Sequence, residues 1–94
     1  MSFIEETITI EKPDEKVIDK LQPKLVLFND HVNSFDYVIW NLVTYCDHGI
    51  IQAEQCATIV HHKGKYAIKH GEIDYLLDLL NVLSENNLTV EIQY

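Results

Sequence analysis

Residues 24–38 read KLVLFNDHVNSFDYV, and this stretch carries the clearest fold signals in the chain. Its first five residues are mostly apolar and predict a short strand, which the turn-forming pair Asn29-Asp30 ends. Either Asn33 or Ser34 then offers a side-chain oxygen as a helix N-cap. The stretch therefore predicts a strand, a polar turn and the start of a helix.

Three segments downstream of this turn show helical spacing of apolar residues. The first predicted helix ends at Cys46, the second runs from about Ile51 to His62, and the third runs from Gly71 to Asn86. Apolar side chains at positions i, i+3, i+4 and i+7 define one buried face on each. The expected buried residues are Phe35, Val38, Ile39, Leu42, Val43 and Cys46; Ala53, Cys56, Ala57 and Val60; and Ile73, Leu76, Leu77, Leu80 and Leu83.

Alternating side chains predict two further strands. One covers residues 65–69, directly after Gly64, which is the expected left-handed C-cap of the second helix. The other covers residues 88–93, after the pair Asn86-Asn87. The order strand, helix, helix, strand, helix, strand predicts an α+β fold, in which a small three-stranded antiparallel sheet packs against three helices.

Residues 1–23 differ in composition from the rest of the chain. They alternate acidic and basic residues and contain both prolines, Pro13 and Pro23. We therefore expect a mobile N-terminal arm over residues 1–23 and one folded domain over residues 24–94. The alternative for the arm is an additional short strand at Thr7 to Ile10.

Composition excludes several functional classes. The net charge is −8, from 7 Lys and 15 Asp plus Glu, and the chain has no Arg, so we expect no nucleic-acid partner. The sequence shows no secretory signal pattern, and no apolar run approaches the roughly 20 residues of a membrane helix. Cys46 and Cys56 are too few for a disulfide scaffold, and we expect two reduced, buried thiols in a cytoplasmic protein.

The histidines form no recognised metal or catalytic pattern. His61 and His62 are adjacent and point about 100° apart on a helix, so they do not chelate one ion together. A set of Ser34, His61 and Asp30 can be assembled, but no nucleophile elbow frames the serine. We expect no catalytic residues, no metal and no cofactor; a small hydrolase or metal protein is the alternative class.

A polar cluster beside an apolar face is the best candidate for a binding site. If the first two helices pack on the sheet, an apolar pocket forms whose mouth carries hydrogen-bond acceptors. Such a site suits an apolar side chain next to a cationic amine. Turn and cap roles account for the same polar residues without any ligand, so both interpretations stay open. The pocket residues are Phe35, Ala57 and Val60, and the acceptors are Asn29, Asp30 and His61.

Two motifs resemble the ClpS family, the adaptors of the Clp protease. The first motif, similar to the family's entry motif, is residues 27–38, LFNDHVNSFDYV. The second, similar to the family's second signature, is residues 52–65, QAEQCATIVHHKGK. The resemblance covers residues 24–93 and implies a ClpS-like fold. It also implies a non-enzymatic, cytoplasmic adaptor that binds bulky apolar N-terminal residues (N-degrons) and delivers their proteins to a Clp AAA+ unfoldase. The alternative is a ClpS-fold regulator of the unfoldase whose N-degron site has drifted.

The resemblance further implies partners and a role for each site residue. The partners are N-degron peptides and proteins and the N-terminal domain of a Clp AAA+ unfoldase, with no membrane. By position, the residues that surround the substrate's α-amine are Asn29, Asp30 and His61. The hydrophobic pocket consists of Phe35, Ala57, Val60 and, from the last strand, Val90. The rim of the pocket carries His31 and Asn33. His31 stands where the family commonly has a second acid, and Ala57 replaces a methionine that often gates the pocket.

Overall fold

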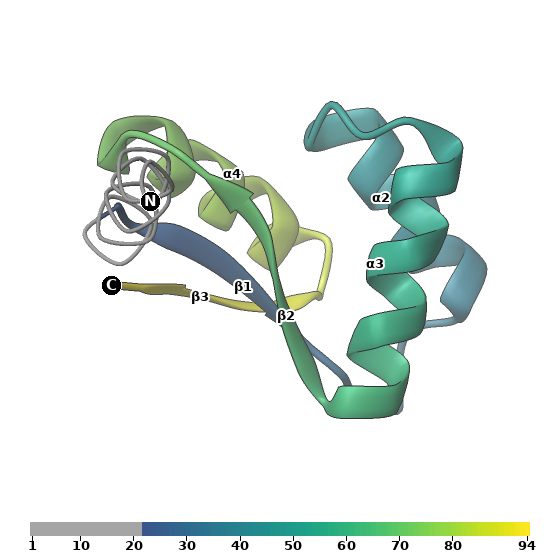
Figure 1. The fold of residues 1–94 in the computed structure, drawn as a ribbon. Coiled ribbons are helices and arrows are strands. Elements are labelled where there is room, and N and C mark those ends of the chain that lie inside the picture. Colours follow the sequence, from purple (N-terminus) through teal and green to yellow (C-terminus); the bar gives the residue numbers. More distant parts are fainter. Residues whose placement is uncertain (1–21) are drawn as a thin grey trace, which may run out of the picture.

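The predicted order of elements is confirmed by the structure, a computed structural model that describes residues 22–94 (Figure 1). The predicted arm, apart from its last two residues, and the alternative strand at Thr7 to Ile10 lie outside the described residues. Predicted and observed ends of the elements agree within one or two residues. The elements are β1 (Lys24–Phe28), α2 (Phe35–Tyr45), α3 (Ile50–Lys63), β2 (Lys65–His70), α4 (Ile73–Glu85) and β3 (Thr89–Gln93).

The three strands form one antiparallel sheet in the order β2-β1-β3. The central strand, β1, is buried over Leu25, Val26 and Leu27. Leu27 lies opposite Tyr66 on β2 and Val90 on β3. Because both neighbours hold β1 in register, the polar turn that follows it leaves the sheet from a fixed position.

Local side-chain and backbone chemistry sets the ends of the helices. The Ser34 side chain accepts a hydrogen bond from the Tyr37 backbone N–H at 3.1 Å, so Ser34 is the N-cap of α2 and Asn33 is not. Gly64 ends α3 in the left-handed conformation, with φ of 94°, as predicted. Asn87 also has a positive φ, of 69°, in the turn between α4 and β3. Asn tolerates this conformation because its short polar side chain bonds locally.

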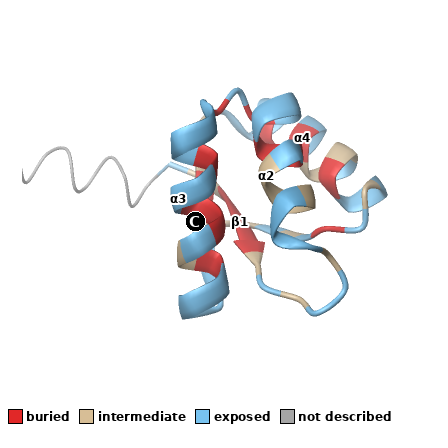
Figure 2. Ribbon diagram, turned by 90° about the vertical axis from the view of Figure 1, so that its right-hand side faces the viewer, coloured by how far each residue is buried: buried red, intermediate tan, exposed pale blue. Residues whose placement is uncertain are grey.

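The core joins the sheet to all three helices (Figure 2). The prediction for α3 is confirmed, since its four expected residues are all buried. On α2 and α4 the predicted face of the helix packs against the core, but fewer of its residues are buried than expected. Phe35 and Val43 are 46% and 36% exposed, and on α4 Leu77 is 42% exposed while Leu79 is buried. Spacing identifies the centre of a buried face, but the width of that face depends on what packs beside the helix.

Two free thiols and a histidine lie in the interior, Cys46 and His48 in the loop between α2 and α3 and Cys56 on α3. Cys46 and Cys56 are both buried, and burial raises the pKa of both, that of Cys46 to about 11, so each is a neutral thiol at neutral pH. His48 is buried, with its Nε2 2.9 Å from the Ile68 carbonyl. The Lys69 ammonium donates to the Cys46 carbonyl at 2.8 Å. These two contacts hold the loop against β2.

Candidate functional site

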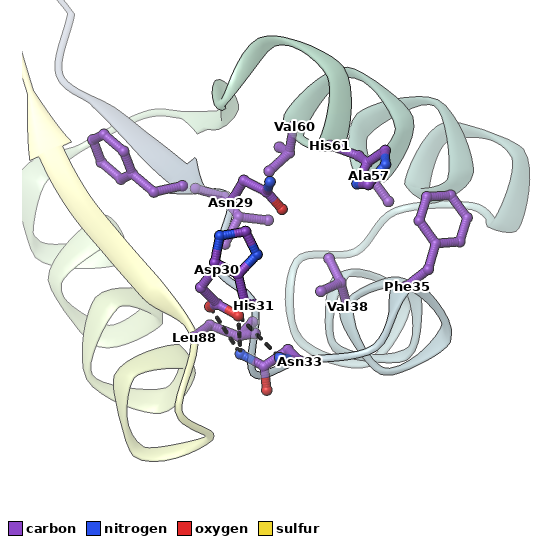
Figure 3. A pocket seen from close by; sticks show the side chains of 12 residues that line it. Asn29, Asp30, His31, Asn33, Phe35, Val38, Ala57, Val60, His61 and Leu88 are labelled. Carbon is purple, nitrogen blue, oxygen red and sulfur yellow. Dashed lines mark hydrogen bonds between the residues drawn. The ribbon is translucent and has the colours of Figure 1, made fainter.

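A cavity of about 430 Å³ opens where the end of β1 meets α2 and α3 (Figure 3). This volume lies within the range of small-ligand sites. The cavity brings together the three predicted amine-site residues, both predicted rim residues and three of the four predicted pocket residues. The lining consists of Leu27, Phe28, Asn29, Asp30, His31, Asn33, Phe35, Val38, Ala57, Val60, His61 and Leu88.

The fourth predicted pocket residue, Val90, does not line the cavity. It lies opposite Leu27 in the sheet and packs against the core instead. Leu88, just before β3, provides the wall on this side. Its backbone N–H donates to the Leu83 carbonyl at 3.0 Å, and this bond holds Leu88 beside the end of α4. The sequence offered one usable signal for Leu88, an apolar residue directly after the Asn86-Asn87 turn.

The Asp30 carboxylate holds the turn after β1 in shape. Its Oδ1 accepts from the backbone N–H groups of Val32 and Asn33, each at 2.9 Å. The Asn33 side-chain amide donates to Oδ1 at 3.2 Å and to Oδ2 at 3.0 Å. Burial alone raises the pKa of Asp30, but these hydrogen bonds and the nearby His31 outweigh it and leave the pKa below its usual value. Asp30 is therefore an anion at neutral pH, and its Oδ2 retains a free lone pair.

Asn33 connects this turn to a distant part of the chain. Besides its bonds to Asp30, the Asn33 side-chain amide donates to the Asn87 carbonyl at 2.8 Å. The neighbouring Asn86 side chain donates to Asn41 Oδ1 at 2.7 Å. Asn33 therefore fixes the turn that carries Asp30 against the turn before β3. Asn86 in turn fixes that second turn against α2. Sequence reasoning missed this asparagine network, because its members are more than 40 positions apart.

Asn29 and His61 present polar groups that the fold does not use. The Asn29 backbone N–H donates to the Gly64 carbonyl at 2.8 Å, which holds the residue beside the end of α3. Within residues 22–94, neither the Asn29 side chain nor the His61 ring makes a hydrogen bond; the His61 ring only packs edge-on against His62, 5.2 Å between centroids. In Figure 3 the polar side chains of Asn29, Asp30 and His31 lie together in the middle of the cavity.

The remaining walls of the cavity are apolar. Ala57 and Val60 are buried on α3, and Val38 lies on the facing side of α2 (Figure 3). Phe35 is 46% exposed at the start of α2 and contributes an aromatic ring to the lining. The cavity therefore combines an apolar surface with a carboxylate and two unused polar side chains.

The part of the chain that the structure describes offers little support for other kinds of site. Between residues 22 and 94, no three His, Cys, Asp or Glu side chains are grouped so as to hold a metal ion. The helices in this part of the chain are also too short or too polar to span a lipid bilayer. Ser34, a member of the assembled triad, uses its hydroxyl oxygen as the cap of α2.

The fold and this cavity define a small α+β binding module. The family model described as ATP-dependent Clp protease adaptor protein ClpS matches residues 19–89. The chain therefore belongs to the ClpS family of Clp protease adaptors, which is an adaptor family and not a catalytic one.

Solved structures show the same fold. The structure of Agrobacterium tumefaciens ClpS2 bound to L-phenylalaninamide is similar with a TM-score of 0.63 and 16% identity, covering 77% of this chain and 96% of that chain. Among curated proteins, no sequence matches. The structural similarity confirms the predicted three-helix, three-strand architecture.

Proposed function

We propose that the cavity binds the first residue of substrate proteins that begin with a bulky apolar side chain, and that the domain delivers these proteins to a Clp AAA+ unfoldase. The observation that carries this proposal is the meeting, in one cavity, of apolar walls with the polar side chains of Asn29, Asp30 and His61. Membership of the ClpS family supports the unfoldase as partner. Two free thiols fit action in the reducing cytoplasm.

The polar end of the cavity matches the chemistry of a free chain terminus. An ammonium group has three N–H donors and no acceptor. The Asn29 side-chain oxygen, an unprotonated His61 ring nitrogen and the free lone pair on Asp30 Oδ2 supply three acceptors for it. Hydrogen bonds to charged groups contribute roughly 1.5–3 kcal/mol each. An internal peptide segment lacks the ammonium and leaves these acceptors unsatisfied.

The apolar end of the cavity matches a large side chain. Burial of a Leu or Phe side chain contributes roughly 1.5–3 kcal/mol. Ala57 and Val60 present a buried apolar surface for it, and the half-exposed Phe35 adds an aromatic ring to the lining. A terminal residue that satisfies both ends gains from each, which explains how one small site selects a single position of a protein chain.

The direct test is a titration of the full chain with labelled peptides that differ only in their first residue. We expect saturable binding of peptides that begin with Leu, Phe, Tyr or Trp, and weak binding of those that begin with Arg or Asp. Equal affinity for all of them, or no binding of any, would support the alternative of an adaptor-like regulator whose site has drifted.

The absence of a long side chain at Ala57 predicts tolerance of β-branched first residues. Ala57 is buried and lines the cavity, so Ala57→Met adds three heavy atoms inside it. We expect this variant to weaken an Ile-starting peptide about five-fold more than a Leu-starting one, since small changes in an apolar pocket decide roughly 1–3 kcal/mol. The measurement is fluorescence anisotropy with both peptides. Thr58→Met, an exposed neighbour on α3, is the matched control, and equal losses for both peptides would place Ala57 outside the side-chain pocket.

We propose that residues 1–23 act as an arm that engages the unfoldase after the domain has docked. Their alternating charges and two prolines are typical of a segment without a core of its own. A chain that begins at residue 22 should bind Leu-starting peptides within about two-fold of the full chain, because every cavity residue is retained. It should slow the degradation of a Leu-starting substrate by the Clp protease. Loss of peptide binding on this truncation would instead make the segment part of the fold.

A further inference from the structure

Helix α2 carries an aromatic patch outside the cavity, formed by the exposed residues Trp40, Val43 and Tyr45 and the partly buried Tyr37. Trp40, the only tryptophan of the chain, is 51% exposed. Its ring stacks on Tyr37, with 6.2 Å between centroids and 16° between planes, and meets Tyr45 edge-on at 5.8 Å. None of the four lines the cavity. This surface is therefore separate from the proposed N-degron site.

Hydrogen bonds with Asn86, the C-cap of α4, hold the patch in place. The Tyr37 hydroxyl donates to the Asn86 carbonyl at 2.9 Å. The buried Asn41, one helical turn further along α2, donates to the Tyr37 carbonyl at 2.9 Å and accepts from the Asn86 side chain at 2.7 Å. The Tyr37 ring, on which Trp40 stacks, is thus anchored at its hydroxyl. A preorganised aromatic surface loses little conformational freedom when it binds a partner.

The surroundings of the aromatic patch are anionic. Asp36 on α2 and Glu85 at the end of α4 are the acids next to it, and neither helix contains a Lys, Arg or His. Asp36 lies one turn before Trp40 on the same face of α2. Glu85 ends α4 directly before Asn86, where the helix dipole already contributes negative potential. Lys69 lies at the end of α2, where its ammonium donates to the Cys46 carbonyl.

Charge also decides what kind of molecule fits this surface. Residues 1–21 contain six acids and three lysines, and a second copy of the chain carries the same net charge of −8. Both are therefore poor electrostatic matches. We propose that the aromatic patch binds a basic segment of a partner protein, one in which Arg side chains alternate with aliphatic residues. A guanidinium stacks on the face of Trp40 and pairs with the Asp36 carboxylate, while an aliphatic neighbour packs on Val43.

The test uses a labelled peptide of alternating Arg and Leu, acetylated and amidated so that it has no free amine for the cavity. With the full chain we expect saturable anisotropy and a change in Trp40 emission, and an affinity at least about five-fold higher than that of the matching Glu/Leu peptide. Trp40→Leu should weaken binding about five-fold or more through loss of the cation–π contact. Asp36→Asn and Glu85→Gln should each weaken it about three-fold or more.

Asp74→Asn is the matched control, because it removes the same charge from the first turn of α4, at the opposite end of that helix from Asn86, which contacts Tyr37. It should change the affinity less than about two-fold. Two results with the variants would overturn the proposal: equal losses of affinity in Asp36→Asn and Asp74→Asn, or unchanged affinity in Trp40→Leu. A rise in affinity for the Arg/Leu peptide of more than about five-fold on removal of residues 1–21 would also overturn it, because the arm would then be the occupant of the patch. An unchanged midpoint of thermal unfolding in Trp40→Leu shows that the variant is folded. The outcome of this test does not depend on whether the cavity binds N-degron peptides.

Discussion

A peptide that begins with a free Leu or Phe should bind at least about 100-fold more tightly than the same peptide with an acetylated N-terminus. Acetylation removes the positive charge and leaves one N–H donor in place of three. The acceptors on Asn29, Asp30 and His61 then lose their partner while still facing a largely apolar cavity. A hundred-fold loss corresponds to about 2.7 kcal/mol, the value of one or two charge-assisted hydrogen bonds.

The measurement is competition between the free and the acetylated peptide for a labelled Leu-starting peptide. A peptide with Leu at its second position and Gly at its first is a useful control, because it keeps the amine and misplaces the side chain. If the acetylated peptide competed as well as the free one, the polar end of the cavity would not be an amine site. The apolar pocket would then serve a different ligand.

Asp30→Ala should weaken peptide binding by at least about 30-fold and also lower the free energy of unfolding by about 1–3 kcal/mol. The substitution removes the only carboxylate that residues 22–94 contribute to the cavity lining. It also leaves the Val32 and Asn33 backbone donors without their acceptor, so the turn after β1 loses its shape. Both effects act on the amine end of the cavity, so the loss of affinity combines the missing charge with the altered turn.

Two further variants separate charge from shape. Asp30→Asn keeps an oxygen for the backbone donors but removes the charge, so it should retain most of the stability and lose most of the affinity. Asp78→Ala on α4 removes an exposed acid far from the cavity and should change neither. If Asp30→Asn bound peptide as tightly as the unaltered chain, Asp30 would organise the turn without contributing to the amine site.

The lowered pKa of Asp30 also predicts a direction for acid sensitivity. Because the pKa is lower in the folded than in the unfolded chain, ionised Asp30 stabilises the fold at neutral pH. This contribution is complete above the unfolded value of about 3.9 and is lost as the pH falls through the lower, folded value. The difference in stability between the unaltered chain and Asp30→Asn should therefore shrink in acid. Urea unfolding at pH 7 and pH 3 measures it.

Much of the fold could be predicted from local patterns. Helical spacing placed Ala53, Cys56, Ala57 and Val60 on one face, and all four are buried. Gly64 was predicted as a left-handed cap because only glycine adopts that conformation without strain from a Cβ atom, and its φ of 94° confirms this. These features depend on residues within one or two helical turns of each other, and such short-range interactions are visible in a sequence.

Local patterns in the chain were enough to predict the order of the elements, the helix faces and the polar residues at the end of β1. Contacts between elements put Leu88 in the cavity lining in place of Val90, and they let Asn33 span 54 positions to reach the Asn87 carbonyl. The tertiary structure also decided that Phe35 lies half exposed at the cavity, and that Asn41, within an apolar run of α2, is fully buried. Packing and hydrogen bonding between elements depend on how the elements are arranged in space. Local periodicity in the sequence does not specify that arrangement.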